Sequence, residues 1–148
     1  MTETLSPEAL ARAAAEVMWA ADRATRGLGI TLDAIGPGRA TLSLTVTEAM
    51  TNGHGTCHGG FIFALADSAF AFACNSYNQR TVAHMASITF LAPGRPGMKL
   101  TAEAREISRQ GRNGIYDIRV SADDGTHVAE FRGHSRTVKG THLPDPSQ

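Results

Sequence analysis

The chain has 148 residues, 42% of them hydrophobic, and its 14 basic and 14 acidic side chains give a formal net charge of zero. This length fits one domain with a sizeable core, and the balanced charge indicates neither a nucleic-acid nor a membrane partner. The longest apolar run, residues 61–74, is interrupted by Asp67 and Ser68 and is too short to cross a bilayer. The first ten residues lack the pattern of a secretory signal, and the two cysteines form no CxxC spacing, so we expect a cytoplasmic protein.

A helix is predicted over residues 6–26. Ser6 followed by Pro7 is a typical helix start. Apolar residues then recur at helical spacing, and Gly27 is a typical helix end.

Strands are predicted on both sides of a second helix that begins at Gly59. Residues 39–46 alternate apolar and polar side chains, as in an antiparallel strand with one buried face. A single apolar helix beside a single antiparallel sheet is buried when the sheet wraps around it, which predicts an α+β fold. The strands are expected at 30–35, 39–46, 82–91, 99–108, 115–122 and 127–138. We expect one domain over 1–148, with a core at 30–140 and a flexible tail at 141–148.

The stretch from Asn52 to Ser76 is the most informative part of the chain. A glycine-rich polar loop leads into the apolar helix, and a single carboxylate, Asp67, lies in the middle of that helix. An ionised carboxylate is costly to bury, so such a position is either hydrogen-bonded for structure or kept for chemistry. Gly59 and Gly60 place free backbone N–H groups at the positive end of the helix dipole. An oxyanion site and an acid or base on one element suggest chemistry on a carbonyl group.

These residues carry a family resemblance. The order of strands, long helix and further strands resembles the hotdog-fold acyl-CoA thioesterases, most closely the phenylacetate-degradation (PaaI-type) branch. The hallmark stretch matches at Asn52, His54, Thr56, Cys57, His58, Gly59, Gly60, Leu65, Ala66, Asp67, Ser68, Ala69, Phe70, Cys74, Asn75 and Ser76. The segments ITFLAPG (88–94), RQGRNGIYD (109–117) and FRGHS (131–135) are also similar to this branch.

The resemblance implies a function and a set of roles. It implies hydrolysis of phenylacetyl-CoA and ring-hydroxylated or ring-opened relatives to free acid and coenzyme A, with no cofactor beyond the substrate. Asp67 is implied as nucleophile or general base, and the Gly59 N–H as the group that polarises the thioester carbonyl. Asn52 is implied to orient water or to hydrogen-bond the substrate or Asp67, although a turn-forming asparagine is the alternative. Ala83 stands where some relatives place a hydroxyl residue.

Helix geometry supports the assembly that the resemblance implies. Gly59 and Asp67 are eight residues apart, so their backbones are about 12 Å apart on one straight helix. An aspartate side chain cannot span that distance, so an Asp67 beside Gly59 has to come from a second copy. The family resemblance implies the same homodimer, with active sites at the interface, stacked as a dimer of dimers.

The histidine and cysteine next to the helix start have competing interpretations. His58 suggests a general base, but it is nine residues from Asp67, so we expect its ring to fix the oxyanion turn by a hydrogen bond. Cys57 is adjacent to His58, a poor geometry for a nucleophile and its base, and is expected to be a small buried thiol. His54, Cys57 and His58 lack a further metal ligand, so we expect no metal.

Coenzyme A needs cations for its phosphates and an apolar channel for its pantetheine arm. Arg109, Gly111 and Arg112 form the most site-like loop, while Arg80 and Arg95 are further candidates. For any single arginine, a solvated surface charge is at least as good an account. Phe61 and Phe70 are candidates for contact with an aromatic acyl group.

Two other functions stay open at this point. A hotdog dehydratase or hydratase requires a histidine paired with a carboxylate, and His58 with Asp67 is the available pair. A non-catalytic acyl-CoA sensor on the same fold would bind the ligand without turnover, but it gives no reason to keep Asp67.

Overall fold

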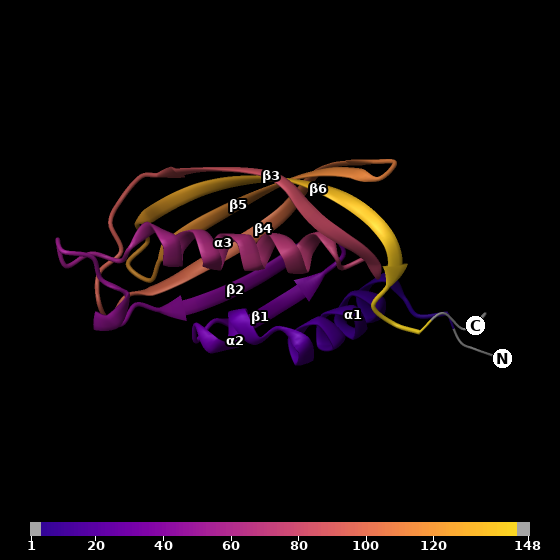
Figure 1. Cartoon of the computed structure of the whole chain (residues 1–148), viewed down its shortest axis with the longest axis horizontal. Coiled ribbons are helices and arrows are strands. Elements are labelled where there is room, and N and C mark those ends of the chain that lie inside the picture. The colour runs from indigo at the N-terminus through magenta and orange to yellow at the C-terminus, as the bar shows by residue number, and fades with distance from the viewer. Residues whose placement is uncertain (1–3, 145–148) are drawn as a thin grey trace.

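The computed structural model describes residues 4–144, which form one antiparallel sheet around a central helix. Figure 1 shows the helix α3 lying along the concave side of the sheet, with the two N-terminal helices, α1 and α2, below it. The sheet has six strands in the order β1-β2-β4-β5-β6-β3. The elements are α1 (Pro7–Ala21), α2 (Arg23–Gly27), β1 (Thr31–Gly36), β2 (Arg39–Thr45), a 3-10 turn (Glu48–Met50), α3 (Gly59–Cys74), β3 (Gln79–Phe90), β4 (Lys99–Gln110), β5 (Asn113–Ala122) and β6 (His127–Thr141).

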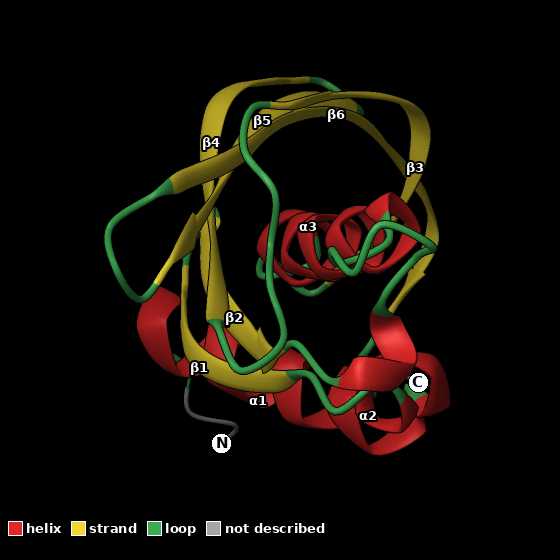
Figure 2. Ribbon diagram, turned by 90° about the vertical axis from the view of Figure 1, so that its left-hand side faces the viewer, coloured by secondary structure: helices red, strands yellow, loops and turns green. Residues whose placement is uncertain are grey.

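The sheet curves around α3, as the hotdog resemblance predicts. Figure 2 shows strands on several sides of the helix. Because α3 is apolar on most of its circumference, it buries side chains against the concave faces of the strands, and Leu65, Ala66, Ala69 and Phe70 are fully buried there. Gly133 of β6 allows close packing, since a Cβ at this residue would lie 2.7 Å from the ring of Phe70. No helix within residues 4–144 has both the length and the apolar character needed to cross a membrane.

The N-terminal segment forms two helices where the sequence predicts one over 6–26. α1 ends at Ala21, and Asp22 is extended and caps the start of α2. Both Asp22 carboxylate oxygens are used, because they accept from the Thr25 N–H at 2.9 Å and the Thr25 hydroxyl at 2.6 Å. An aspartate that satisfies two donors three residues ahead favours a new helix start over continuation of the old one.

The strand ends extend beyond several predicted limits, and so does the ordered chain near the C-terminus. β6 continues to Thr141 and pairs there with Gln79 of β3. The next residues are held as well, because the backbone N–H groups of His142 and Leu143 donate to the side-chain oxygen of Asn78. This differs from the flexible tail expected from residue 141, and residues 145–148 lie outside the described part of the chain.

Candidate active site

The start of α3 presents one free backbone donor. The ring Nδ1 of His58 accepts from the Gly60 N–H at 2.9 Å, so the predicted contact of His58 with the turn is confirmed. The Gly59 N–H donates no hydrogen bond to any atom of residues 4–144. An unpaired N–H at the first position of a 16-residue helix is a suitable donor for an oxyanion.

The loop before α3 is organised around Asn52. Its side-chain oxygen accepts from the His54 N–H at 2.9 Å and from the Thr56 N–H at 3.3 Å. The turn-forming alternative is therefore what the structure shows for this oxygen. No contact joins Asn52 to Asp67 within the described residues, and the Asn52 amide NH₂ donates no hydrogen bond there, so that group is available to a ligand.

Asp67 lies in the middle of α3 and is half-buried. Among residues 4–144 its carboxylate takes part in no hydrogen bond and no ion pair. Burial raises the pKa of Asp67 above its ordinary value. Its neighbour Ser68 has a partner in the chain, the Thr25 hydroxyl at 2.9 Å. The lack of a partner is therefore a feature of Asp67 that the next polar residue of the helix does not share.

An apolar cleft opens beside Gly59. Its volume is about 390 Å³. A Cβ at residue 59 would lie 3.0 Å from the ring of Phe90, so this aromatic ring lies against the α-carbon of the proposed oxyanion donor. Phe90 is 52% exposed, and it belongs to the end of β3. The cleft is lined by Cys57, Gly59, Ile62, Phe90, Leu91, Ala92 and Pro93.

Phe90 is not among the residues predicted for acyl contact, although it lies within the ITFLAPG segment. The predicted Phe70 is fully buried and packs between Tyr116 and Phe131, so it belongs to the core. Phe61 is partly buried, and its ring lies 6.5 Å from that of His58. Phe90 contacts Gly59 because the C-terminal end of β3 lies beside the start of α3. No local sequence signal indicates which residue of β3 meets the helix.

Cys57 behaves as the small buried thiol that the sequence predicts. It is 5% exposed, and its Sγ lies 3.6 Å from the carbonyl oxygen of His58. Burial raises the pKa of the Cys57 thiol, which disfavours the reactive thiolate. Within the described residues, no three histidine, cysteine or acidic side chains gather as metal ligands would.

The predicted coenzyme A loop lies at the other end of α3. Arg109 stacks on Tyr77, with its Cζ 3.4 Å from the ring centroid, and its Nε is 3.8 Å from Glu106 Oε1. Gly111 adopts a left-handed φ of 61° in the tight turn, and the Arg112 carbonyl accepts from the Thr137 N–H at 2.8 Å. This hairpin is separated from Gly59 of the same chain by the length of α3, about 24 Å.

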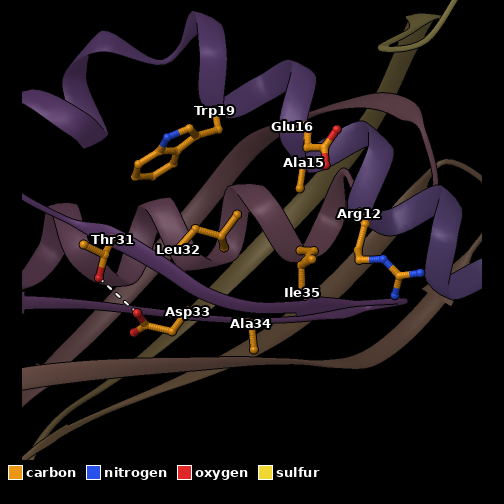
Figure 3. A pocket seen from close by; sticks show the side chains of 9 residues that line it. All are labelled: Arg12, Ala15, Glu16, Trp19, Thr31, Leu32, Asp33, Ala34 and Ile35. Atoms are coloured by element: carbon orange, nitrogen blue, oxygen red, sulfur yellow. Dashed lines mark hydrogen bonds between the residues drawn. The ribbon is translucent and has the colours of Figure 1, made fainter.

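A second hollow lies between α1 and the edge strand β1, and Figure 3 shows the side chains around it. Its volume is about 480 Å³. Trp19, Leu32 and Ile35 give it an apolar part, while Arg12, Glu16 and Asp33 carry both signs of charge at its margin. None of the predicted site residues lines this hollow.

Comparison with known proteins agrees with the fold. Residues 54–129 match the family described as the thioesterase superfamily. The chain is 44% identical to the acyl-coenzyme A thioesterase PaaI of Escherichia coli over 128 residues, which cover 86% of this chain and 91% of the relative. The solved structure of the Escherichia coli PaaI protein from the phenylacetic acid degradation operon superposes with a TM-score of 0.90, at 41% identity, over 92% of this chain and 99% of the other.

A more distant relative gives the same result. A variant of the phenylacetic acid degradation protein PaaI from Thermus thermophilus superposes with a TM-score of 0.76 at 33% identity, over 79% of this chain and all of the other. The predicted family is therefore confirmed. The chain belongs to the thioesterase superfamily, as a hotdog-fold enzyme of the PaaI type.

Proposed function

We propose that the protein hydrolyses aryl-acetyl-CoA thioesters, phenylacetyl-CoA and its ring-hydroxylated relatives, to the free acid and coenzyme A. The observation that carries the proposal is the pairing on α3 of an unbonded Gly59 N–H with an unpartnered, half-buried Asp67. The identity to the acyl-coenzyme A thioesterase PaaI supports the substrate class. The apolar cleft with its aromatic wall at Phe90 supports a flat acyl group next to Gly59.

The active site is proposed to form between two copies of the chain. β3 is an edge strand of twelve residues, and it exposes 48% of Val82, 57% of Met85 and 52% of Phe90. A long apolar edge strand exposes unpaired backbone groups and promotes aggregation of a monomer, and it is well suited to pairing with a second strand. Antiparallel pairing of β3 with its copy about a two-fold axis brings two α3 helices together, with Asp67 of the partner subunit beside Gly59.

The chemistry follows from these two groups. The Gly59 N–H donates to the thioester oxygen and stabilises the oxyanion that forms at that oxygen, a contribution of about 3 kcal/mol in comparable sites. In one route the Asp67 carboxylate takes a proton from water while the water oxygen attacks the carbonyl carbon, and the C–S bond then breaks. The proton passes to the departing thiolate, which restores the carboxylate. In the other route the carboxylate attacks the carbonyl carbon, and the C–S bond breaks to give an anhydride and the CoA thiolate. Water then cleaves the anhydride to the free acid and the Asp67 carboxylate, and the proton that is released passes to the thiolate.

Mixed dimers test the two-chain site. Asp67→Asn removes the carboxylate, and Gly59→Val fills the cleft against Phe90, so each variant alone is expected to be inactive. A randomly paired equal mixture holds one intact site in half of its dimers, so we expect about a quarter of wild-type thiol release from phenylacetyl-CoA. A mixture no more active than either parent would contradict the shared site.

Binding and thiol release, measured together, separate the remaining alternatives. Tight binding of phenylacetyl-CoA, 3,4-dihydroxyphenylacetyl-CoA and a short aliphatic acyl-CoA without thiol release from any of them would favour a sensor. A dehydratase is disfavoured because His58 Nδ1 accepts from the Gly60 N–H, which places the proton of the neutral ring on Nε2 and leaves no ring nitrogen free to act as a base. We also propose that two such dimers assemble into a tetramer, which light scattering would detect. A cytoplasmic location is proposed as well, because both cysteines are free and buried.

A further inference from the structure

A chain of hydrogen bonds joins the N-terminal segment to α3. Thr25 of α2 is 2% exposed, and its hydroxyl oxygen lies 2.6 Å from Asp22 Oδ2 and 2.9 Å from Ser68 Oγ. One turn further along α3, the ring of Phe72 packs against Trp19, with centroids 6.2 Å apart. Figure 2 shows the N-terminal helices on the side of α3 that is away from β5 and β6. One flank of α3 is therefore fixed by a polar and an aromatic contact.

The direction of each hydrogen bond in this chain follows from its donors and acceptors. An ionised carboxylate can only accept, so the one hydrogen of the Thr25 hydroxyl goes to Asp22. The contact between the two hydroxyl groups is then made by the hydrogen of Ser68, which donates to Thr25 Oγ1. Within residues 4–144 nothing donates to Ser68 Oγ. Ser68 therefore has free lone pairs but no free hydrogen, so its remaining capacity is that of an acceptor.

The start of α3 has the opposite requirement. His58 Nδ1 accepts from the Gly60 N–H at 2.9 Å, so the neutral ring carries its hydrogen on Nε2. Within residues 4–144 that Nε2–H has no acceptor. A Cβ at Gly60 would lie 3.1 Å from His58 Nδ1, so the ring lies on the exposed side of α3 to which Gly60 belongs. A donor without an acceptor at His58 thus complements an acceptor without a donor at Ser68.

These two groups cannot meet within one chain, but the proposed dimer brings them to the same height. Ser68 is ten positions after His58, which is about 15 Å along the helix axis. In the dimer the two α3 helices run antiparallel, so each step forward along one helix is a step back along the other. When Asp67 of the partner subunit is level with Gly59, Ser68 of the partner subunit is level with His58.

The exposed stripe of α3 separates Asp67 from Ser68. Successive residues turn by about 100° around a helix, so these two side chains point to opposite sides of the centre of the stripe. That centre is formed by the accessible small residues Gly60, Ala64 and Ala71.

The two sides of the stripe meet different groups across the dimer. A two-fold axis perpendicular to the plane of both helices makes each side of the stripe in one copy face the same side in the other. Gly59 lies on the side of Asp67, as the proposed active site requires. Phe61, whose ring is 6.5 Å from that of His58, lies on the side of Ser68. Height and side therefore agree in bringing Ser68 of the partner subunit to the His58 ring.

We propose that His58 Nε2–H donates a hydrogen bond to Ser68 Oγ of the partner subunit. All the bonds then run in one direction, from the Gly60 N–H through His58 to Ser68, Thr25 and Asp22 of the partner subunit, an order in which each bond strengthens the next. Ser68, Thr25 and Asp22 of one copy thereby act as positioning residues for the oxyanion turn of the other. The inference rests on the proposed function and on its two-chain site.

Variants of Thr25 and Ser68 test the chain of hydrogen bonds. Thr25→Val keeps the shape of the side chain without its hydroxyl, and Ser68→Ala removes the acceptor. We expect each to lower kcat for phenylacetyl-CoA by about tenfold and to change KM by less than about twofold, because an oxyanion donor acts on the transition state. Thr25→Ser restores the hydroxyl and should return kcat to within about twofold of wild type.

Thr31→Val is the matched control. The Thr31 hydroxyl also contacts an aspartate and a serine, Asp33 Oδ1 at 3.0 Å and Ser43 Oγ at 3.0 Å, but on the edge strand β1. Its loss should leave kcat unchanged. In a His58→Ala background, Ser68→Ala should have no further effect on kcat, because its donor is already absent. An undiminished effect of Ser68→Ala in that background would overturn the proposal.

Mixed dimers show which copy supplies Ser68. When Asp67→Asn and Gly59→Val chains are mixed, the intact site joins Gly59 of the first variant to Asp67 of the second. Ser68→Ala should lower the activity of the mixture when it is added to the Gly59→Val chain and not when it is added to the Asp67→Asn chain. His58→Ala should give the reverse pattern. The same pattern for both substitutions would contradict a contact between the two chains.

A spectroscopic measurement makes the test independent of turnover. In protein labelled with ¹⁵N-histidine, the His58 Nε2–H proton, assigned by its absence from His58→Ala, should exchange with water about tenfold more slowly in wild type than in Ser68→Ala. Equal exchange rates in the two proteins would overturn the hydrogen bond. Wild-type protein that protects this proton but releases no thiol from phenylacetyl-CoA would overturn the proposed function and leave the contact standing.

Discussion

Asp67 on α3 and Glu106 on β4 are both partly buried carboxylates, but their surroundings are opposite. Glu106 Oε1 accepts from the Tyr77 hydroxyl at 2.9 Å and from the Tyr116 hydroxyl at 3.1 Å, and Arg109 lies 3.8 Å away. Asp67 has no such partner among residues 4–144, and burial raises its pKa. Glu106 belongs to a hydrogen-bonded polar network, whereas Asp67 is a carboxylate without hydrogen-bond donors on an apolar helix.

The difference shows how partners separate a structural acid from a reactive one. A carboxylate that accepts hydrogen bonds from two hydroxyl groups and faces a guanidinium is stabilised in its charged form, so it has little tendency to take a proton or to attack a carbon. A desolvated carboxylate without donors is a better base, at a cost in folding free energy. Substitution of the two residues should therefore affect different properties of the protein.

The largest expected effect is that of Asp67→Asn on turnover. We expect kcat for phenylacetyl-CoA to fall by about a thousandfold, because the base or nucleophile is lost while the shape of the side chain is kept. At neutral pH the free energy of unfolding should rise, because an ionised group no longer has to be desolvated. Steady-state thiol release and urea unfolding measure the two quantities. Loss of activity together with loss of stability would place Asp67 with Glu106 as a structural residue.

Glu106→Ala should produce the complementary result. Two phenol hydroxyls lose their acceptor, and Tyr116 is only 1% exposed, so water cannot readily replace the carboxylate there. We expect a loss of about 1–3 kcal/mol in the free energy of unfolding, with kcat per folded protein unchanged within twofold. Glu106→Gln keeps an acceptor oxygen and serves as the matched control with a smaller loss. A fall in kcat without a change in stability would contradict this assignment.

The elements with strong local signals could be predicted from the sequence. The apolar run after His58 and Gly59 predicts the helix, and the period-two pattern of residues 39–46 predicts a strand; both are observed. The ring contact of His58 follows from its place at the helix start. The break at Asp22 could have been recognised from the aspartate itself, because a side chain that caps Thr25 favours a new helix start.

Contacts between distant segments could not be predicted in the same way. Phe90 meets Gly59 across 31 positions of sequence, and Arg80 meets Gly140 across 60, so both pairs depend on how β3 lies against α3 and β6. Arg109 lies on an exposed hairpin, where charge alone indicates a ligand site. Its engagement with Tyr77 depends on the packing of that hairpin against the end of α3.

The pH dependence of activity and of stability should be the smallest of these effects. It tests most directly whether Asp67 lacks the compensating partners that Glu106 has. Burial raises the pKa of Asp67, so the proton is held to a higher pH than on an ordinary aspartate. Because activity requires the ionised form, the acidic limb of kcat/KM should lie above the usual aspartate range. For stability the sign is fixed by linkage: a raised folded-state pKa gives a contribution that is complete below the unfolded-state pKa and is lost as the pH rises through the folded-state pKa.

Asp67→Asn provides the matched comparison for that titration. At low pH the wild-type side chain is protonated and resembles the neutral amide, so the two proteins should have nearly the same free energy of unfolding. As the pH rises through the window between the unfolded and folded pKa values of Asp67, the wild-type protein should lose stability relative to the variant, and the difference should then level off. Urea titrations of both proteins at closely spaced pH values measure this curve. A difference that does not vary with pH would mean that Asp67 is as well compensated in the folded protein as Glu106 is.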